Sequence, residues 1–216
     1  MTSQSLNISD RFLNGITCID HKDLSEVNKA KIKECIFDYI AAHTAGKSLI
    51  EDKRSLFLRS SLQELTIDQK EMSYKNLSIE NKVFFTGIIS HTAELDDGNR
   101  FGMIHPGAPV LSLLLPIAKV WNKDFETLAL AILVGYEAGI RLAMAMAPGH
   151  YARGYHPTAT CGAVGAAIGL AKLMNSPIED YKNVLSIVCL SASGTLKVIE
   201  GDSEIKPFNV GNAALN

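Results

Sequence analysis

The stretch from Phe125 to Ala147 constrains the fold most strongly, because it is long, almost wholly apolar and free of proline. Asp124 stands before it as a candidate N-cap, and Pro148 with Gly149 ends it. A helix of this length would span roughly 35 Å at the usual rise per residue. Because its apolar side chains occupy most of its sides, we expect neighbouring helices to cover it.

Other segments also show the apolar spacing of helices. They are residues 25–45, 81–92, 110–121, 158–175 and 177–193. Gly46 is the expected C-cap of the first, and Pro109 and Pro157 are placed to begin two of the others. A short helix is expected over residues 54–62. Strand signals are weak throughout, so we predict an all-α fold, with residues 1–216 forming a single all-helical domain.

Composition argues against several classes of function. Hydrophobic residues make up 47% of the chain and the net charge is -2, so no basic field attracts nucleic acid or a membrane surface. The first residues are polar, which argues against a signal peptide. The most apolar stretch, residues 158–174, has side chains too small for a membrane span. The four cysteines are widely spaced without a CxxC pair, which argues against a zinc site and favours reduced thiols. We therefore expect a cytoplasmic protein.

A polar segment from His91 to Ala108 lies between two apolar runs, and a polar cluster is costly to bury. If the preceding helix continues into it, Glu94 and Asp97 share one face with His91, and Asp96 points elsewhere. Neighbouring carboxylates raise each other's pKa, which suits proton transfer. The alternative is an acidic helix C-terminus that is exposed to water.

Two histidines, His105 and His156, each stand before a proline and an apolar helix. Proline restricts the backbone of the residue before it, so each imidazole is expected to be held firmly. His156 also precedes a helix N-terminus, which favours a bound anion and a neutral imidazole. Lys206 could bind a substrate carboxylate or take part in proton transfer. Lone histidines are more often structural or exposed, and most lysines are solvated, so these alternatives stay open.

Two further patterns in the apolar helices favour structural roles. Glu137 and Arg141 have the favourable i,i+4 order for an ion pair, and a buried pair of this kind is more often structural than catalytic. Gly162, Gly165 and Gly169 fall inside a predicted helix, so they favour close helix packing over nucleotide binding.

Together these segments resemble the MmgE/PrpD family, whose members include 2-methylcitrate dehydratase and cis-aconitate decarboxylase. The resemblance covers roughly residues 25–214 and rests on the order and spacing of four motifs. These are Glu94-Leu-Asp-Asp followed by His105-Pro-Gly-Ala, Gly135-Tyr-Glu with Arg141, Gly154-Tyr-His-Pro-Thr-Ala-Thr-Cys-Gly-Ala, and Lys206-Pro-Phe-Asn-Val-Gly-Asn-Ala-Ala.

The resemblance implies a large helical domain, a smaller α+β lid domain, an active site between them and a homodimer. It implies that no metal or organic cofactor is used, and that a proton next to a carboxylate of a small di- or tricarboxylate is removed or moved, with loss of water or carbon dioxide. On this basis His105, His156 and Lys206 are predicted as catalytic residues. Glu94, Asp97 and Lys206 are predicted to bind the substrate.

The chain departs from the family pattern in three ways. Glu94 replaces the usual aspartate, Gly98 replaces a frequent threonine, and the loop between Asp97 and His105 is slightly longer. These changes favour a different substrate or reaction, for example an epimerase or isomerase. The 216 residues also lack the lid domain, so we expect a second chain to supply it. The alternatives are a catalytically inactive remnant that serves dimerisation or binding, and a fragment of a longer enzyme. Which histidine acts as the base stays open.

Overall fold

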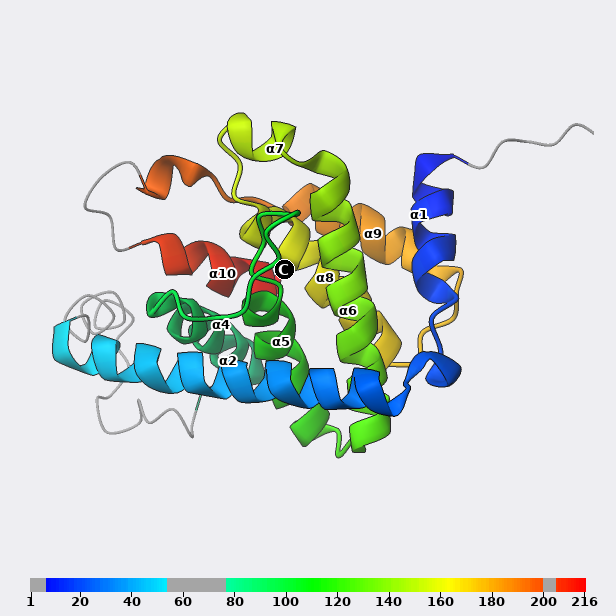
Figure 1. The fold of residues 1–216 in the computed structure, drawn as a ribbon, viewed down its shortest axis with the longest axis horizontal. Helices are drawn as coiled ribbons and strands as arrows, with labels where there is room; N and C mark the ends of the chain where they lie inside the picture. The colour runs from blue at the N-terminus through cyan, green and yellow to red at the C-terminus, as the bar shows by residue number, and fades with distance from the viewer. Residues whose placement is uncertain (1–6, 54–76, 200–204) are drawn as a thin grey trace, which may run out of the picture.

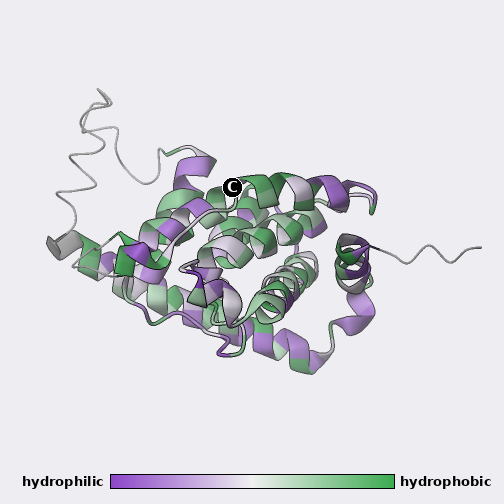
Figure 2. Ribbon diagram, turned by 90° about the horizontal axis from the view of Figure 1, so that it is seen from above, coloured by the Kyte–Doolittle hydropathy of each residue, from purple (hydrophilic) through white to green (hydrophobic). Residues whose placement is uncertain are grey.

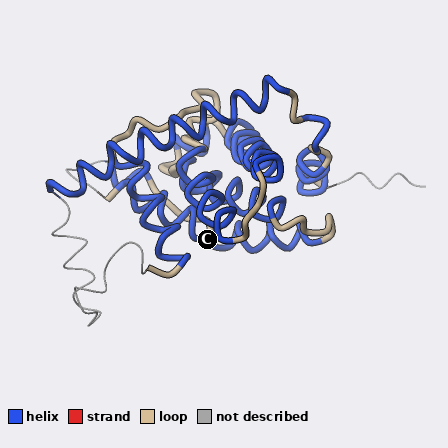
Figure 3. The backbone as a smooth tube through the Cα atoms, turned by 90° about the horizontal axis from the view of Figure 1, so that it is seen from below, coloured by secondary structure: helices blue, strands red, loops and turns tan. Residues whose placement is uncertain are grey.

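The structure, a computed structural model, describes residues 7–53, 77–199 and 205–216. In these ranges the chain consists of helices joined by loops, with no strand (Figure 3). The longer helices are α1 Ile8–Thr17, α2 Glu26–Lys53, α4 Ile79–Thr92, α5 Gly107–Val120, α6 Phe125–Met146, α8 Pro157–Leu173, α9 Asp180–Ser191 and α10 Lys206–Leu215. Single turns of helix are α7 Gly149–Ala152, η1 His21–Asp23 and η3 Leu196–Ile199. The predicted all-α class is therefore confirmed.

Helices α6 and α8 lie at the centre of the fold, and α5 packs against both of them (Figure 1). These three helices supply most of the main apolar core, to which α1, α2 and α9 add side chains. Helix α10 packs against α4 and α8, and the long α2 runs across α4 and α5. Apolar residues run through the central helices in Figure 2, whereas polar residues are frequent on α2 and on the loops.

Helix α6 matches its prediction. The Asp124 side chain accepts a hydrogen bond of 2.7 Å from the Thr127 N–H, so it is the N-cap. Among the described helices, α6 is the one long and apolar enough to cross a membrane, yet half of its apolar stretch is buried inside the fold. It packs along α8 as a core helix.

Glycines let α6 and α8 approach each other closely. A Cβ atom on Gly165 of α8 would lie 2.7 Å from the carbonyl oxygen of Gly135 in α6. A Cβ atom on Gly169 would lie 3.1 Å from the carbonyl oxygen of Ala131, and one on Gly162 would press against α5. The glycines of α8 therefore serve close packing, as predicted.

The remaining predicted helices are present with shifted ends. Helix α4 begins at Ile79, after Ser78 caps it, and α5 begins at Gly107, so Pro109 lies in its first turn. Pro157 begins α8 as expected. The helix predicted for residues 54–62 lies outside the described residues.

The predicted end of α2 is wrong, because the helix continues past Gly46 to Lys53. Gly46 lies where α2 crosses α4, and a Cβ atom there would overlap the carbonyl oxygen of Ile89. A glycine that local rules assign to a helix end is thus required here by a tertiary contact.

The predicted apolar face of α2 is only partly buried. Ile32 lies in the core, and so does Tyr39. Val27 and Phe37 are 78% and 75% exposed, and Ile40 is exposed as well. The apolar residues of α2 therefore lie on two sides of the helix, one facing the core and one facing outward.

Helix α1 was not predicted from the sequence. Asn7 caps it by accepting a hydrogen bond of 2.8 Å from the Asp10 N–H, and Leu13 and Ile16 enter the core.

The predicted ion pair within α6 connects this helix to α1. Arg141 lies 2.6 Å from Glu137 and donates a hydrogen bond of 2.9 Å to the Gly15 carbonyl. The ion pair is thus confirmed, but it is partly exposed rather than buried, because it lies at the edge where α1 meets α6.

The contact between α6 and α8 leads to a stability prediction. Gly165→Ala should lower the free energy of unfolding by about 1–3 kcal/mol, because its methyl group must push two backbones apart. Gly149→Ala is the matched control, since no atom lies within 4 Å of a Cβ atom at that position. Urea unfolding of both variants measures the difference. Equal stability of the two variants would contradict the packing argument.

Candidate active site

A buried carboxylate and a buried imidazole form the centre of the polar segment. Both oxygens of Asp96 lie close to Nδ1 of His91, at 3.0 and 2.9 Å. The side chain of His91 is 0% exposed and that of Asp96 is 1% exposed. Because a carboxylate is an acceptor, His91 donates its Nδ1 proton to Asp96.

The expected geometry of this segment is wrong in one respect. Helix α4 ends at Thr92, and Glu94 has a positive φ of 51°, so the chain turns sharply. Asp96 consequently points back to His91 instead of away from it. Glu94 and Asp97 do not share a helix face with His91.

His105 is held against this buried pair. Its backbone N–H donates to Oγ1 of Thr158 at 3.1 Å, and its Nδ1 lies 3.2 Å from the backbone carbonyl of Asp96. The rings of His105 and His91 contact each other edge to face, with centroids 5.1 Å apart. Since a carbonyl only accepts, Nδ1 of His105 carries a proton and Nε2 keeps its lone pair. The side chain of His105 is 34% exposed, so a ligand can reach it.

His156 is in a different protonation environment. It is the N-cap of α8 and is 4% exposed. Burial lowers its pKa from 6.5 to about 3, and the nearby Lys206 ammonium group adds a smaller contribution. Nδ2 of Asn209 lies 3.4 Å from Nδ1 of His156 and donates to it. His156 is therefore neutral near pH 7, with its proton on Nε2.

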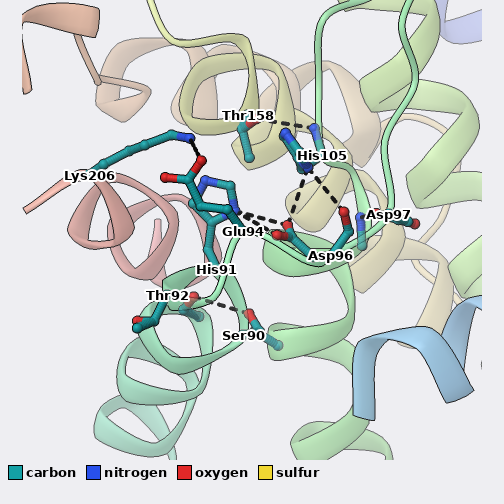
Figure 4. Close-up of polar contacts among 12 residues, drawn as sticks. Ser90, His91, Thr92, Glu94, Asp96, Asp97, His105, Thr158 and Lys206 are labelled. Atoms are coloured by element: carbon teal, nitrogen blue, oxygen red, sulfur yellow. Dashed lines mark hydrogen bonds and ion pairs between the residues drawn. The ribbon is translucent and has the colours of Figure 1, made fainter. Parts of the chain in front are cut away.

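Lys206 forms an ion pair with Glu94. Its Nζ atom lies 2.9 Å from Oε2 of Glu94, across the mouth of the cluster in Figure 4. The side chain of Lys206 is 18% exposed and that of Glu94 is 58% exposed. The lysine comes from the first residue of α10, and the glutamate from the loop after α4.

Asp97 lies on the opposite side of the cluster from Lys206 (Figure 4). It accepts hydrogen bonds from the Gly107 N–H at 2.9 Å and from the Tyr136 hydroxyl at 2.8 Å. Burial raises the pKa of Asp97, and these two hydrogen bonds oppose the rise; the neighbouring Asp96 charge adds a smaller increase. Asp97 therefore connects the polar loop to α5 and α6, and its role in substrate binding stays a prediction.

Most of the predicted site residues gather in one place. His105, His156, Lys206 and Glu94 surround the same space as His91, which contacts His156 with ring centroids 5.9 Å apart. Four residues that position these groups were not predicted as site residues: His91, Asp96, Thr158 and Asn209. The last two lie inside the His156 and Lys206 motifs, so their position in those motifs was the available signal.

The same cluster offers a donor set for a cation. Nitrogen atoms of His91 and His105 and an oxygen of Asp96 lie within 4.8 Å of one another. Two imidazoles and a carboxylate suit divalent transition metals. The short distances from His91 to Asp96 are, however, those of ordinary hydrogen bonds, which protons satisfy.

The fold and the cluster define a helical domain with a polar site of imidazoles, carboxylates and one lysine. A sequence profile of the MmgE/PrpD N-terminal domain matches residues 11–216. The chain belongs to the MmgE/PrpD family.

Two curated relatives are similar to part of this chain. Cis-aconitate decarboxylase of Aspergillus terreus is 28% identical over 129 residues, which cover 57% of this chain and 26% of the relative. The protein of the same name from A. terreus strain NIH 2624 / FGSC A1156 matches with the same 28% identity and coverage. The matched region thus spans about a quarter of the length of these relatives.

The raised pKa of Asp97 predicts a pH-dependent stability. Because the folded state holds this proton more tightly than the unfolded state, the stability contributed by protonated Asp97 is lost as pH rises through the folded pKa. The unfolding free energy of the wild type minus that of Asp97→Asn should therefore fall between about pH 4 and neutrality.

A second aspartate provides a control of opposite sign. The N-cap hydrogen bond lowers the pKa of Asp124, so the wild type should gain stability relative to Asp124→Asn as pH rises. Urea unfolding from about pH 2.5 to neutrality measures both differences, with the gain of Asp124 expected mainly below about pH 4. The same slope for both variants would contradict the environment assigned to Asp97.

The environment of His156 predicts its protonation state. At pH 5, where a free imidazole is mostly charged, His156 should remain neutral with its proton on Nε2, because burial disfavours the charged form. Histidine side-chain nitrogen NMR reports both properties. Asn209→Ala should weaken the preference for the Nε2 proton. A doubly protonated His156 at pH 5 would contradict the prediction.

Proposed function

We propose that this chain supplies the catalytic residues of an MmgE/PrpD-type lyase or isomerase. Its substrate would be a small di- or tricarboxylate from which a proton next to a carboxylate is removed. The observation that carries the proposal is the convergence of His105, His156 and Lys206, from three distant segments, around one partly exposed space.

Each of these groups has a role suited to its environment. Lys206 binds a substrate carboxylate, which takes the place of Glu94 on the ammonium group. His105 accepts the proton from the substrate carbon at Nε2, which carries the free lone pair. The electron pair left on carbon moves toward the adjacent carboxylate, where the neutral His156 can donate a hydrogen bond from its Nε2–H. A proton returned to the other face gives an isomer, and loss of a leaving group gives an alkene.

His105 is the better candidate for the base. A pKa of about 3 makes His156 too weak a base near pH 7, where catalytic bases work best with a pKa near the operating pH. His105 is more exposed and keeps Nε2 free. This assignment chooses between the two histidines that the sequence could not distinguish.

A second polypeptide belongs to this proposal. We propose that a lid carried by a second chain closes the site. We also propose a homodimer in the cytoplasm, which acts without a metal or organic cofactor.

A specific observation favours the alternative, a helical dimerisation or binding domain without catalysis. Ile187 and Leu190 on α9 are 63% and 89% exposed, and Val27 and Phe37 are exposed on α2. Apolar side chains that lie together on a surface mark association sites, and Ile187 and Leu190 are three residues apart on α9. The ion pair of Glu94 with Lys206 also fills the site with the protein's own carboxylate.

Calorimetric titration with citrate-like di- and tricarboxylates tests the substrate class. Wild-type protein should bind at least one acid, and Lys206→Met should weaken binding by about ten- to hundred-fold, because a charge-assisted hydrogen bond is lost. Lys182→Met is the matched control, since Lys182 pairs with Asp10 on another part of the surface. No binding by the wild type, or equal binding by both variants, would favour the non-catalytic alternative.

A further inference from the structure

We propose that Asp96 and His91 are positioning residues, which hold His105 with Nε2 free and stabilise the imidazolium that forms when Nε2 takes up a proton. This inference rests on the proposed function for its catalytic consequence. The arrangement of the three side chains can be tested without any turnover.

His105 is fixed on the side away from the ligand. Its backbone is held by Thr158, and Nδ1 faces two acceptors that both belong to Asp96. The backbone carbonyl of Asp96 lies 3.2 Å away and its Oδ2 atom 3.6 Å away. Both acceptors require a proton on Nδ1, so Asp96 determines the tautomer of His105. Asp96 also places a negative charge behind the His105 ring.

His91 fixes the carboxylate of Asp96. Nδ1 of His91 contacts both carboxylate oxygens, which restricts the rotation of that group. Nε2 of His91 is buried and has no hydrogen-bond partner among the described residues. A charged His91 would bury an unsatisfied N–H there, which is more costly than an unpaired lone pair on a neutral ring. A neutral His91 does not cancel the negative charge of Asp96. That charge can therefore stabilise a positive charge on His105.

The catalytic step uses this charge. As the substrate C–H bond breaks, its proton forms a bond to Nε2, and positive charge spreads over the ring to Nδ1. The buried carboxylate at 3.6 Å then faces an imidazolium instead of a neutral ring. The attraction is strong because the carboxylate is 1% exposed and little water screens it. Asp96 acts through His105 and does not contact the substrate.

Nitrogen NMR of the wild-type chain provides the first test. His105 should carry its neutral-state proton on Nδ1, whereas His156 should carry its proton on Nε2. In Asp96→Asn the backbone carbonyl at 3.2 Å remains, but the negative charge that lies 3.6 Å from Nδ1 is lost, so the share of His105 with a proton on Nδ1 should fall in part. Asp97→Asn is the matched control, because that side chain faces Tyr136, and it should leave the His105 tautomer unchanged. A proton on Nε2 of wild-type His105, or a metal ion on its Nδ1, would overturn the proposal.

Proton exchange provides the second test. In heavy water, the chain with a bound carboxylic acid and any lid partner should exchange the proton next to the carboxylate. Asp96→Asn should slow this exchange by about 10²-fold or more while the Kd of the acid changes little, because only the proton-transfer step is affected. An unchanged exchange rate would overturn the role of Asp96. Absence of binding and exchange in the wild type would instead refute the proposed function, and the tautomer measurement would still decide the positioning role.

Discussion

The close contact between α6 and α8 determines most of the other positions in this fold. Glycine faces glycine across the two helices, so their backbones touch and neither can shift without separation of the pair. The N-terminus of α8 carries His156 and Thr158, and Thr158 holds the backbone of His105. The apolar core thus places the polar residues at one end of two packed helices.

The polar and charged groups of the site satisfy one another's hydrogen bonds and charges within a small volume. Asp96 serves two imidazoles, because its carboxylate accepts from His91 and its backbone carbonyl accepts from His105. The carboxylate of Asp97 is satisfied by a backbone N–H and a tyrosine hydroxyl. A lysine at the mouth is paired with a glutamate. Two histidines of this cluster have opposite tautomers. An amide donates to Nδ1 of His156, whereas a carbonyl accepts from Nδ1 of His105. Hydrogen-bond partners, more than burial alone, distinguish the two rings.

The sequence predicted those features that depend on local chemistry. Asp124 and Pro157 mark helix starts, and the apolar runs between such signals were long enough to identify α6 and α8. Local signals are misleading at Gly46. A glycine is required there because α2 contacts Ile89, which belongs to another helix. The turn at Glu94 could not be predicted either, since a positive φ is uncommon for a residue other than glycine. The family motifs pointed to His105, His156 and Lys206 but not to Asp96, Thr158 and Asn209, which contact the two histidines.

Asp96 and Asp97 are neighbours in the chain, yet they point to opposite sides of one loop. Asp96 contacts the histidines, whereas Asp97 contacts the start of α5 and Tyr136 in α6. Two adjacent residues therefore connect the helical scaffold to the ring of His105. The hydrogen bonds of Asp97 to Gly107 and Tyr136 fix this loop on α5 and α6, so the position of these helices determines where the Asp96 carboxylate lies behind His105. Substitutions in the apolar core that move α5 or α6 should therefore shift the Asp96 carboxylate without changing a residue of the site.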